Sequence, residues 1–260
     1  MVQSPVSNSN KPSIVVVPGS FSPASFYIPI VNKLRENGYE AMVENLPSAS
    51  RSPPEAPATM EEDAAFFHDV FEKLADQGKD VVVVTHSYGG VPGTEATRGL
   101  AKAERAEAGK PGGISRLVYL TSVVPPPGNS LQDLMGDLVP SFIQFEGEFM
   151  KHVIEESAKL TFSDLPFEEA VEWVKKMPFH SGPSFTGKLT YPGYKYIPVS
   201  FIQCEKDVIL PPEFQNSVIE TIQKESGNPV DLHTLATGHC PNASAPNDVA
   251  KIIMIAVAAA

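Results

Sequence analysis

The strongest constraint on the fold is a run of four valines at residues 81–84, which stops at a hydroxyl residue, Thr85, and is followed closely by Ser87 and the glycines Gly89 and Gly90. β-Branched residues favour strands, and the run is too short to span a membrane, so it predicts a parallel strand buried on both faces. The residues that follow, from Thr85 through Ser87 to Gly90, predict a sharp turn and then a helix. On such a turn the Ser87 hydroxyl projects from the edge of the sheet, beside helix N–H groups that favour developing negative charge.

Strand-like segments recur along the chain at residues 14–17, 39–44, 81–85, 117–121, 199–204 and 230–235. Helical patterns lie between most of them. One has the capping-box spacing of Thr59 and Glu62, and another starts at Pro211 and ends near Gly227. This alternation predicts right-handed crossovers and an α/β fold, with a mostly parallel central sheet and helices on both faces. In such sheets, ligands bind at the carboxyl ends of the strands.

The alternation stops over residues 122–197, and this long interval predicts an inserted helical cap, because a structureless loop of that length is uncommon. Amphipathic patterns predict cap helices near residues 138–160 and 166–177. Most aromatic residues of the cap are expected to pack within it, and the candidates for lining a substrate pocket are Phe142, Trp173, Phe179 and His180. The predicted organisation is a disordered or extended segment (1–13), a first α/β core segment (14–121), the cap (122–197) and a second α/β core segment (198–260).

Charge and cysteine content exclude several classes of function. The formal net charge of -11 disfavours nucleic acid and anionic membranes as partners. Residues 1–13 are polar and lack the apolar core of a signal peptide, so we expect a cytoplasmic protein. The two cysteines, Cys204 and Cys240, are too few for a disulfide framework and are not spaced as metal ligands. The cysteine spacing therefore predicts no metal site. We expect a monomer or a homodimer.

A serine hydroxyl becomes a nucleophile only with a base to take its proton, and the base must be oriented by a carboxylate. Of the six histidines, His239 lies in a loop after a strand, shaped by glycine and proline. Asp207 follows the strand at residues 199–204 and is the preferred carboxylate, with Glu205 as its rival. The ordinary alternative for either carboxylate is a role in a turn or a helix cap.

The negative charge that forms when a carbonyl is attacked needs two hydrogen-bond donors. The backbone N–H of Tyr88, directly after Ser87, is the first candidate. The second is expected in the loop after the opening strand, at Ser20, with Phe21 as the alternative. Gly19 in the same loop would let the backbone approach the substrate closely, so Gly19 and Phe21 are also candidates for substrate binding.

These segments resemble the α/β-hydrolase superfamily. Residues 85–89, Thr-His-Ser-Tyr-Gly, are similar to the nucleophile elbow G-x-S-x-G, with Thr85 in place of the first glycine. The loop at residues 17–21 resembles the family's H-G-x-x segment, with proline in place of histidine. The order serine, acid, histidine along the chain is also that of the family. The resemblance runs from residue 14 to the end, and it implies an α/β-hydrolase fold and a cofactor-free enzyme.

Among compact members of the superfamily, the chain is similar in size and cap placement to plant-type esterases and hydroxynitrile lyases, and to uncharacterised fungal homologues. The lyases typically carry lysine after the catalytic histidine and threonine where Gly19 stands. This chain has Cys240 and Gly19 at those positions, so the resemblance implies an esterase.

We therefore predict a serine hydrolase that cleaves a small-to-medium apolar carboxylic ester or lactone through an acyl-enzyme, with Ser87, Asp207 and His239 as the triad. The alternative is a lyase or other non-hydrolytic enzyme of secondary metabolism on the same fold, with His239 as general base. A non-catalytic ligand receptor is disfavoured, because no member of the triad is replaced.

Overall fold

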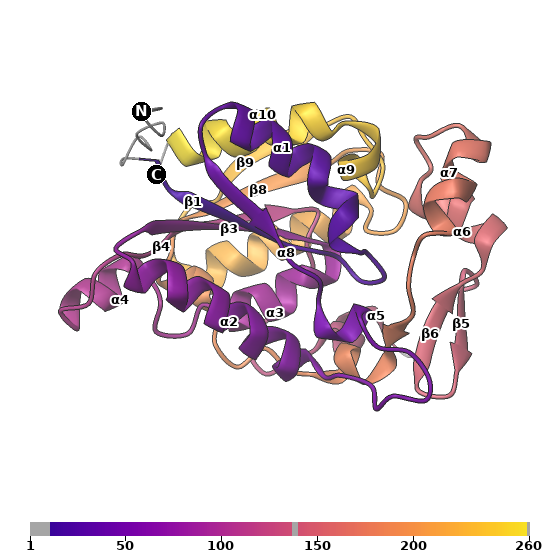
Figure 1. Cartoon of the computed structure of the whole chain (residues 1–260), viewed down its shortest axis with the longest axis horizontal. Coiled ribbons are helices and arrows are strands. Elements are labelled where there is room, and N and C mark those ends of the chain that lie inside the picture. Colours follow the sequence, from indigo (N-terminus) through magenta and orange to yellow (C-terminus); the bar gives the residue numbers. More distant parts are fainter. Residues whose placement is uncertain (1–10, 137–139, 259–260) are drawn as a thin grey trace, which may run out of the picture.

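Six strands form one sheet in the order β2-β1-β3-β4-β8-β9, and every pair of neighbours is parallel. The computed structural model describes residues 11–136 and 140–258, and Figure 1 shows the sheet at its centre. The strands are β1 (Ser13–Val17), β2 (Glu40–Val43), β3 (Asp80–His86), β4 (Gly113–Leu120), β8 (Val199–Cys204) and β9 (Asp231–Leu235). The predicted fold class is confirmed. Of the predicted leading segment, residues 1–10 lie outside the described residues.

Alternate residues of the valine strand β3 belong to two separate cores. Val81 and Val83 pack into one core, and Val82 and Val84 pack into the other. One core includes α2 (Met60–Asp76), α3 (Gly90–Glu95) and α8 (Pro212–Ser226), and the other includes α1 (Ile28–Glu36) and α10 (Pro246–Ala258). Figure 1 shows α1 and α10 on one side of the sheet and α2 and α3 on the other. The four central residues of the strand are all apolar, without alternation, because both of its faces are covered.

Two helix boundaries follow the predicted local signals. At the start of α2, Glu62 N–H donates to Thr59 Oγ1 over 3.3 Å, and Thr59 N–H donates to the Glu62 carboxylate over 2.9 Å. Helix α8 begins directly after Pro211, and it ends at Gly227, which has a left-handed φ of +71°. The remaining short elements outside the 122–197 interval are α4 (Lys102–Glu107), α9 (Pro241–Ser244), η1 (Ala24–Tyr27), η2 (Pro47–Ala49) and η3 (Ser87–Gly89).

The interval of residues 122–197, here called the insertion, differs from the prediction in its first half. A helix is predicted at 138–160, but residues 143–152 form a hairpin, and among the described residues of that range only those from Ile154 onward are helical. Residues 137–139 lie outside the described residues. The two-residue turn begins at Gly147, whose φ of +62° suits a tight hairpin. The described elements are α5 (Leu131–Met135), β5 (Ile143–Glu146), β6 (Phe149–His152), α6 (Ile154–Thr161), α7 (Phe167–Val174), β7 (His180–Ser181), η4 (Gly182–Thr186) and η5 (Gly193–Lys195).

The helix predicted at 166–177 is present as α7. Figure 1 shows β5, β6, α6 and α7 grouped together at the right of the view, to one side of the main sheet. Across the described ranges, no helix combines the length and the apolar character that a bilayer crossing requires.

Candidate active site

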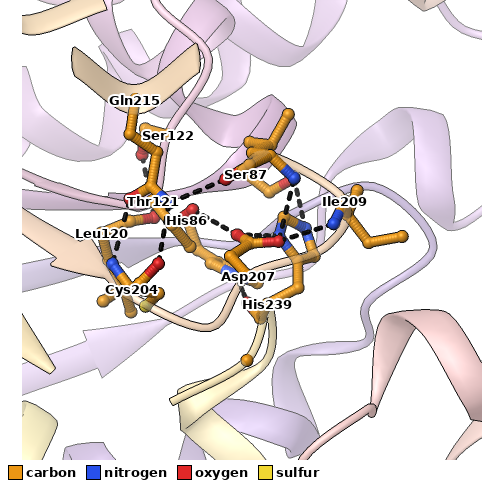
Figure 2. A network of polar contacts seen from close by, with 12 residues as sticks. His86, Ser87, Leu120, Thr121, Ser122, Cys204, Asp207, Ile209, Gln215 and His239 are labelled. Atoms are coloured by element: carbon orange, nitrogen blue, oxygen red, sulfur yellow. Dashed lines mark hydrogen bonds and ion pairs between the residues drawn. The ribbon is translucent and has the colours of Figure 1, made fainter. Parts of the chain in front are cut away.

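Ser87 lies at the end of β3 on a strained turn. Its φ is +51°, in the left-handed region that residues with a Cβ rarely adopt. The chain can turn this sharply because two glycines follow. A Cβ on Gly89 would lie 2.3 Å from Pro18 O, and one on Gly90 would lie 2.3 Å from Val123 O, so both positions require glycine. This is the geometry of a nucleophile elbow, and Figure 2 shows Ser87 beside His239.

Thr85 fits where the motif usually has glycine. Its Oγ1 lies 2.8 Å from Ser122 Oγ, so its hydroxyl is hydrogen-bonded although it is buried. Its methyl group packs against Gly93, where an added Cβ would lie 2.6 Å from Thr85 Cγ2. The larger residue is therefore accommodated by a glycine on α3, further along the chain.

The structure brings Ser87, His239 and Asp207 together at the carboxyl ends of β3, β9 and β8 (Figure 2). Ser87 Oγ lies 3.0 Å from His239 Nε2, and His239 Nδ1 lies 2.7 Å from Asp207 Oδ2. A carboxylate only accepts hydrogen bonds, so the proton of neutral His239 is on Nδ1, and Nε2 is free to accept the Ser87 proton. All three residues are buried: Ser87 is 8% exposed, His239 5% and Asp207 2%.

The Asp207 carboxylate is held by several donors at once. Thr121 Oγ1 donates to Oδ2 over 2.6 Å, and the backbone N–H groups of Ile209 and Leu210 donate to Oδ1 over 2.8 and 2.9 Å. Burial by itself raises the pKa of Asp207, but the charge of His239 and the hydrogen bonds from His239, Thr121 and Leu210 lower it below its ordinary value. The group therefore stays ionised when it orients the imidazole.

Glu205, the rival carboxylate, is exposed and is not part of this cluster. Thr121 is not singled out by the sequence, although it stands at the carboxyl end of a predicted strand, where site residues are expected. Its φ of +36° is unusual for a β-branched residue, and its hydroxyl points at Asp207.

His86 forms a buried bridge that sequence reasoning missed. Its Nε2 lies 2.8 Å from the backbone oxygen of His239, which only accepts, so Nε2 carries the proton. Its Nδ1 then accepts from Tyr27 Oη over 2.7 Å, and Tyr27 Oη in turn accepts from Gly19 N–H over 2.9 Å. Burial, together with the charge of His239, lowers the pKa of His86 to about 3, so the ring is neutral. The bridge joins the elbow to both neighbouring loops.

The backbone N–H groups of Ser20 and Tyr88, the predicted oxyanion donors, differ from that of Phe21, the alternative donor, in whether they already have an acceptor. Phe21 N–H donates to His180 Nδ1 over 3.4 Å, and Phe21 has a left-handed φ of +56°. For Ser20 N–H and Tyr88 N–H we find no acceptor among residues 11–136 and 140–258. Gly19 packs tightly, because a Cβ there would lie 3.0 Å from His86 Nδ1 and 3.2 Å from Ser87 Cβ. The geometry therefore favours Ser20 over Phe21 as the second donor.

A cavity of about 250 Å³ opens beside Ser87 and His239. Gly19, Ser20 and Phe21 line its base, and much of the rest of its wall is apolar and comes from the insertion. The apolar wall includes Leu131, Met135, Phe142, Ile143, Phe145 and Phe185. A mostly apolar cavity with a few polar groups at one end is typical of a site for a small organic molecule.

Phe142 lines this cavity as predicted, but Trp173 and Phe179 do not, so their assignment was wrong. Trp173 lies on α7 and packs edge-on against Phe26, with ring centroids 4.7 Å apart, where it joins the insertion to the core. Phe179 packs edge-on against Phe149 at 6.2 Å. Both rings pack against other aromatic side chains and do not line the cavity.

His180 is also absent from the cavity wall, and it is fully buried behind Phe21. Since its Nδ1 accepts from Phe21 N–H, its proton is on Nε2, which lies 3.0 Å from Ser184 Oγ. Ser184 Oγ donates onward to Ser181 O over 2.7 Å. Burial is the main cause that lowers the pKa of His180 to about 3, and the ring is neutral.

Cys204 and Cys240 are buried free thiols. Burial raises the pKa of Cys204 to about 12 and that of Cys240 well above its ordinary value, so neither ionises near neutral pH. Cys240 lines the cavity beside His239 but does not supply a thiolate.

Comparison with known proteins shows the family to which the chain belongs. The chain matches the model of the alpha/beta hydrolase family over residues 14–252 and therefore belongs to that family. It is 36% identical to probable hydrolase R7 of Phoma sp., over 94% of this chain and 97% of that protein. It is 26% identical to alpha/beta hydrolase nvfD of Aspergillus novofumigatus, over 94% and 95% of the two chains.

Solved structures share the fold at lower identity. A pyrethroid hydrolase from Sphingobium faniae JZ-2 superposes with a TM-score of 0.72 at 20% identity, covering 95% of this chain and 98% of that one. Polyneuridine aldehyde esterase superposes with a TM-score of 0.72 at 18% identity, covering 95% and 99%.

Proposed function

We propose that this chain is a serine hydrolase that cleaves a carboxylic ester or lactone of apolar character. The observation that carries the proposal is the unbroken hydrogen-bonded relay from Ser87 Oγ through His239 to Asp207, at the end of an apolar cavity. The names of two structural neighbours, a pyrethroid hydrolase and polyneuridine aldehyde esterase, are consistent with ester cleavage. The apolar wall from the insertion favours an uncharged substrate, because burying an unpaired charge is costly.

In the first half of the reaction, Ser87 Oγ attacks the carbonyl carbon while its proton moves to His239 Nε2. Asp207 keeps its negative charge and stabilises the imidazolium that forms. His239 then gives the proton to the departing alkoxide, the carbon–oxygen bond breaks, and the acyl group stays on Ser87. In the second half, His239 takes a proton from water, the hydroxide attacks the acyl carbon, and the proton returns to Ser87 as the acid leaves.

The tetrahedral intermediates place a negative oxygen near the end of β3. We assign its stabilisation to the backbone N–H groups of Tyr88 and Ser20, which are the predicted donors and have no acceptor among the described residues. Tyr88 N–H also lies in the turn that leads into α3, where the partial positive charge of the backbone favours an anion.

Replacement of the nucleophile tests the proposal. Ser87→Ala should lower kcat/KM for an activated ester such as p-nitrophenyl butyrate by at least about 10³-fold, because the covalent route is lost. A fluorophosphonate probe should label the wild-type chain on Ser87 and should leave the variant unlabelled. Circular dichroism of the variant checks that the fold is retained. Equal turnover by the two proteins would rule out Ser87 as the nucleophile.

Labelling with the fluorophosphonate and product analysis also distinguish ester hydrolysis from the lyase alternative. In that alternative, His239 is a general base and Ser87 forms no covalent bond with the substrate. That reaction gives eliminated instead of hydrolysed product, and no acyl-enzyme can be trapped. The 3.0 Å contact of Ser87 Oγ with His239 Nε2 on a strained turn favours the covalent route.

A further inference from the structure

The proposed second oxyanion donor, Ser20 N–H, lies between two backbone N–H groups that are both fixed by buried side chains. On one side, Gly19 N–H donates to Tyr27 Oη over 2.9 Å. On the other, Phe21 N–H donates to His180 Nδ1 over 3.4 Å. Of three consecutive N–H groups, the middle one is left available for a ligand. The two flanking bonds restrain the backbone on both sides of Ser20.

The contact on the Gly19 side belongs to the core. Tyr27 is fully buried, and its hydroxyl proton goes to His86 Nδ1, since His86 Nε2 carries the imidazole proton and donates it to the His239 carbonyl. The Tyr27 oxygen is therefore free to accept from Gly19 N–H. This chain of bonds ties the loop of Ser20 to the segment that carries the base, so one set of contacts positions both.

The contact on the Phe21 side comes from the insertion. His180 stands at the start of β7 and is fully buried, and its Nε2–H donates to Ser184 Oγ over 3.0 Å. Ser184 Oγ uses its own proton on the Ser181 carbonyl, so the direction of every bond in this chain is fixed. Phe21 has a φ of +56°, a conformation that is unfavourable for a residue with a side chain. The bond to His180, with packing of the two rings at a centroid distance of 5.0 Å, offsets part of that strain.

We propose that Tyr27 and His180 are positioning residues, which clamp residues 19–21 from the core and from the insertion and thereby aim Ser20 N–H at the oxyanion. This inference rests on the proposed ester hydrolysis. Neither side chain touches the substrate, since neither lines the cavity. Each acts through the backbone, so loss of either should weaken binding of the transition state more than binding of the ester.

Three variants test the clamp. Tyr27→Phe removes only the hydroxyl, and His180→Leu removes the acceptor for Phe21 N–H. Each should lower kcat by roughly 10-fold with KM changed less than about twofold, because removal of a complete oxyanion donor costs about 10²-fold or more and misorientation costs less. His180→Asn retains an acceptor near the position of Nδ1 and should recover most of the activity.

The matched controls are Tyr196→Phe, at a half-exposed tyrosine, and His68→Asn, at a histidine of α2 whose ring hydrogen-bonds the Ala96 carbonyl.

A transition-state analogue distinguishes this role from a general loss of structure. A trifluoromethyl ketone forms a tetrahedral oxyanion on Ser87, so its affinity should fall in Tyr27→Phe and His180→Leu by the same factor as kcat/KM. If kcat and ketone affinity stay within about twofold of wild type, or if KM rises instead, the inference is wrong.

A measurement on the wild-type chain does not depend on the variants folding. When the ketone binds, the amide proton resonance of Ser20 should move downfield, while those of Gly19 and Phe21 stay close to their free positions. An unchanged Ser20 resonance, or a larger shift at Phe21, would overturn the assignment. Failure of the proposed function looks different, because the wild-type chain would then neither hydrolyse the activated ester nor react with the fluorophosphonate.

Discussion

The floor and the roof of the cavity differ in how their polar atoms are partnered. We take the floor as Ser87, His239 and the buried core residues hydrogen-bonded to them in series, at and just after the carboxyl ends of the core strands. Here Asp207 accepts four hydrogen bonds, and both ring nitrogens of His86 and His239 are bonded. On the roof, which the insertion provides, His152 Nε2 and Thr161 Oγ1 are buried without a partner among the described residues. Both residues lie in the cavity wall.

This difference indicates that the floor serves the chemical step and the roof serves substrate binding. A fully hydrogen-bonded cluster in a buried place is rigid, which suits groups that must keep their geometry during the reaction. A largely apolar wall binds by contact area and shape, so its residues can change with less effect on the chemistry. We expect substitutions on the floor to lower kcat, and substitutions of insertion residues that line the cavity to change KM.

The largest effect is expected on the floor, at Asp207. Asp207→Asn should reduce kcat by about 10⁴-fold, because an amide in place of the carboxylate favours the wrong tautomer of His239 and no longer stabilises the imidazolium. Steady-state rates with p-nitrophenyl butyrate measure this, and Glu205→Gln, close by but exposed, is the control. A loss in the control as large as that in Asp207→Asn would reverse the assignment of the two carboxylates.

A smaller effect on the floor is expected at Thr121. Thr121→Val keeps the shape of the side chain and removes the hydrogen bond to Asp207 Oδ2, while the two backbone donors to the carboxylate remain. We expect kcat/KM to fall by roughly 10-fold, the value of one hydrogen bond to a charged group. Thr221→Val on α8 serves as the matched control, because its hydroxyl donates to the Ser217 carbonyl of the same helix. Full activity in Thr121→Val would mean that Asp207 does not need this partner.

The smallest effect is expected on the roof, at Phe142. Phe142→Ala should raise KM by about 5- to 10-fold for an aryl ester and leave kcat within about threefold, because contact area with the substrate is lost and the triad is not touched. Phe179→Ala, which removes an aromatic ring of the insertion outside the cavity wall, should leave KM unchanged. A fall in kcat with constant KM at Phe142 would contradict the distinction between floor and roof.

Local patterns predicted the core well. The valine run, the paired glycines after Ser87 and the capping box at Thr59 each depend on neighbours within a few residues, and the structure has the strand, the turn and the helix start where they are predicted. The insertion was harder to predict. Residues 143–152 have an amphipathic pattern that fits a helix, but a glycine at the tight turn and pairing between β5 and β6 make them a hairpin. Short apolar segments are ambiguous in this way.

The sequence by itself determined the parallel sheet, the elbow at Ser87 and the three triad candidates, because a parallel sheet places the carboxyl ends of all its strands on the same side. Only the tertiary structure decided which side chains support them. Tyr27 meets His86 across 59 positions of the chain, and Phe21 meets His180 across 159. Such contacts depend on how whole elements pack and leave no local pattern, which is also why Trp173, Phe179 and His180 were predicted as pocket-lining candidates although they do not line the cavity.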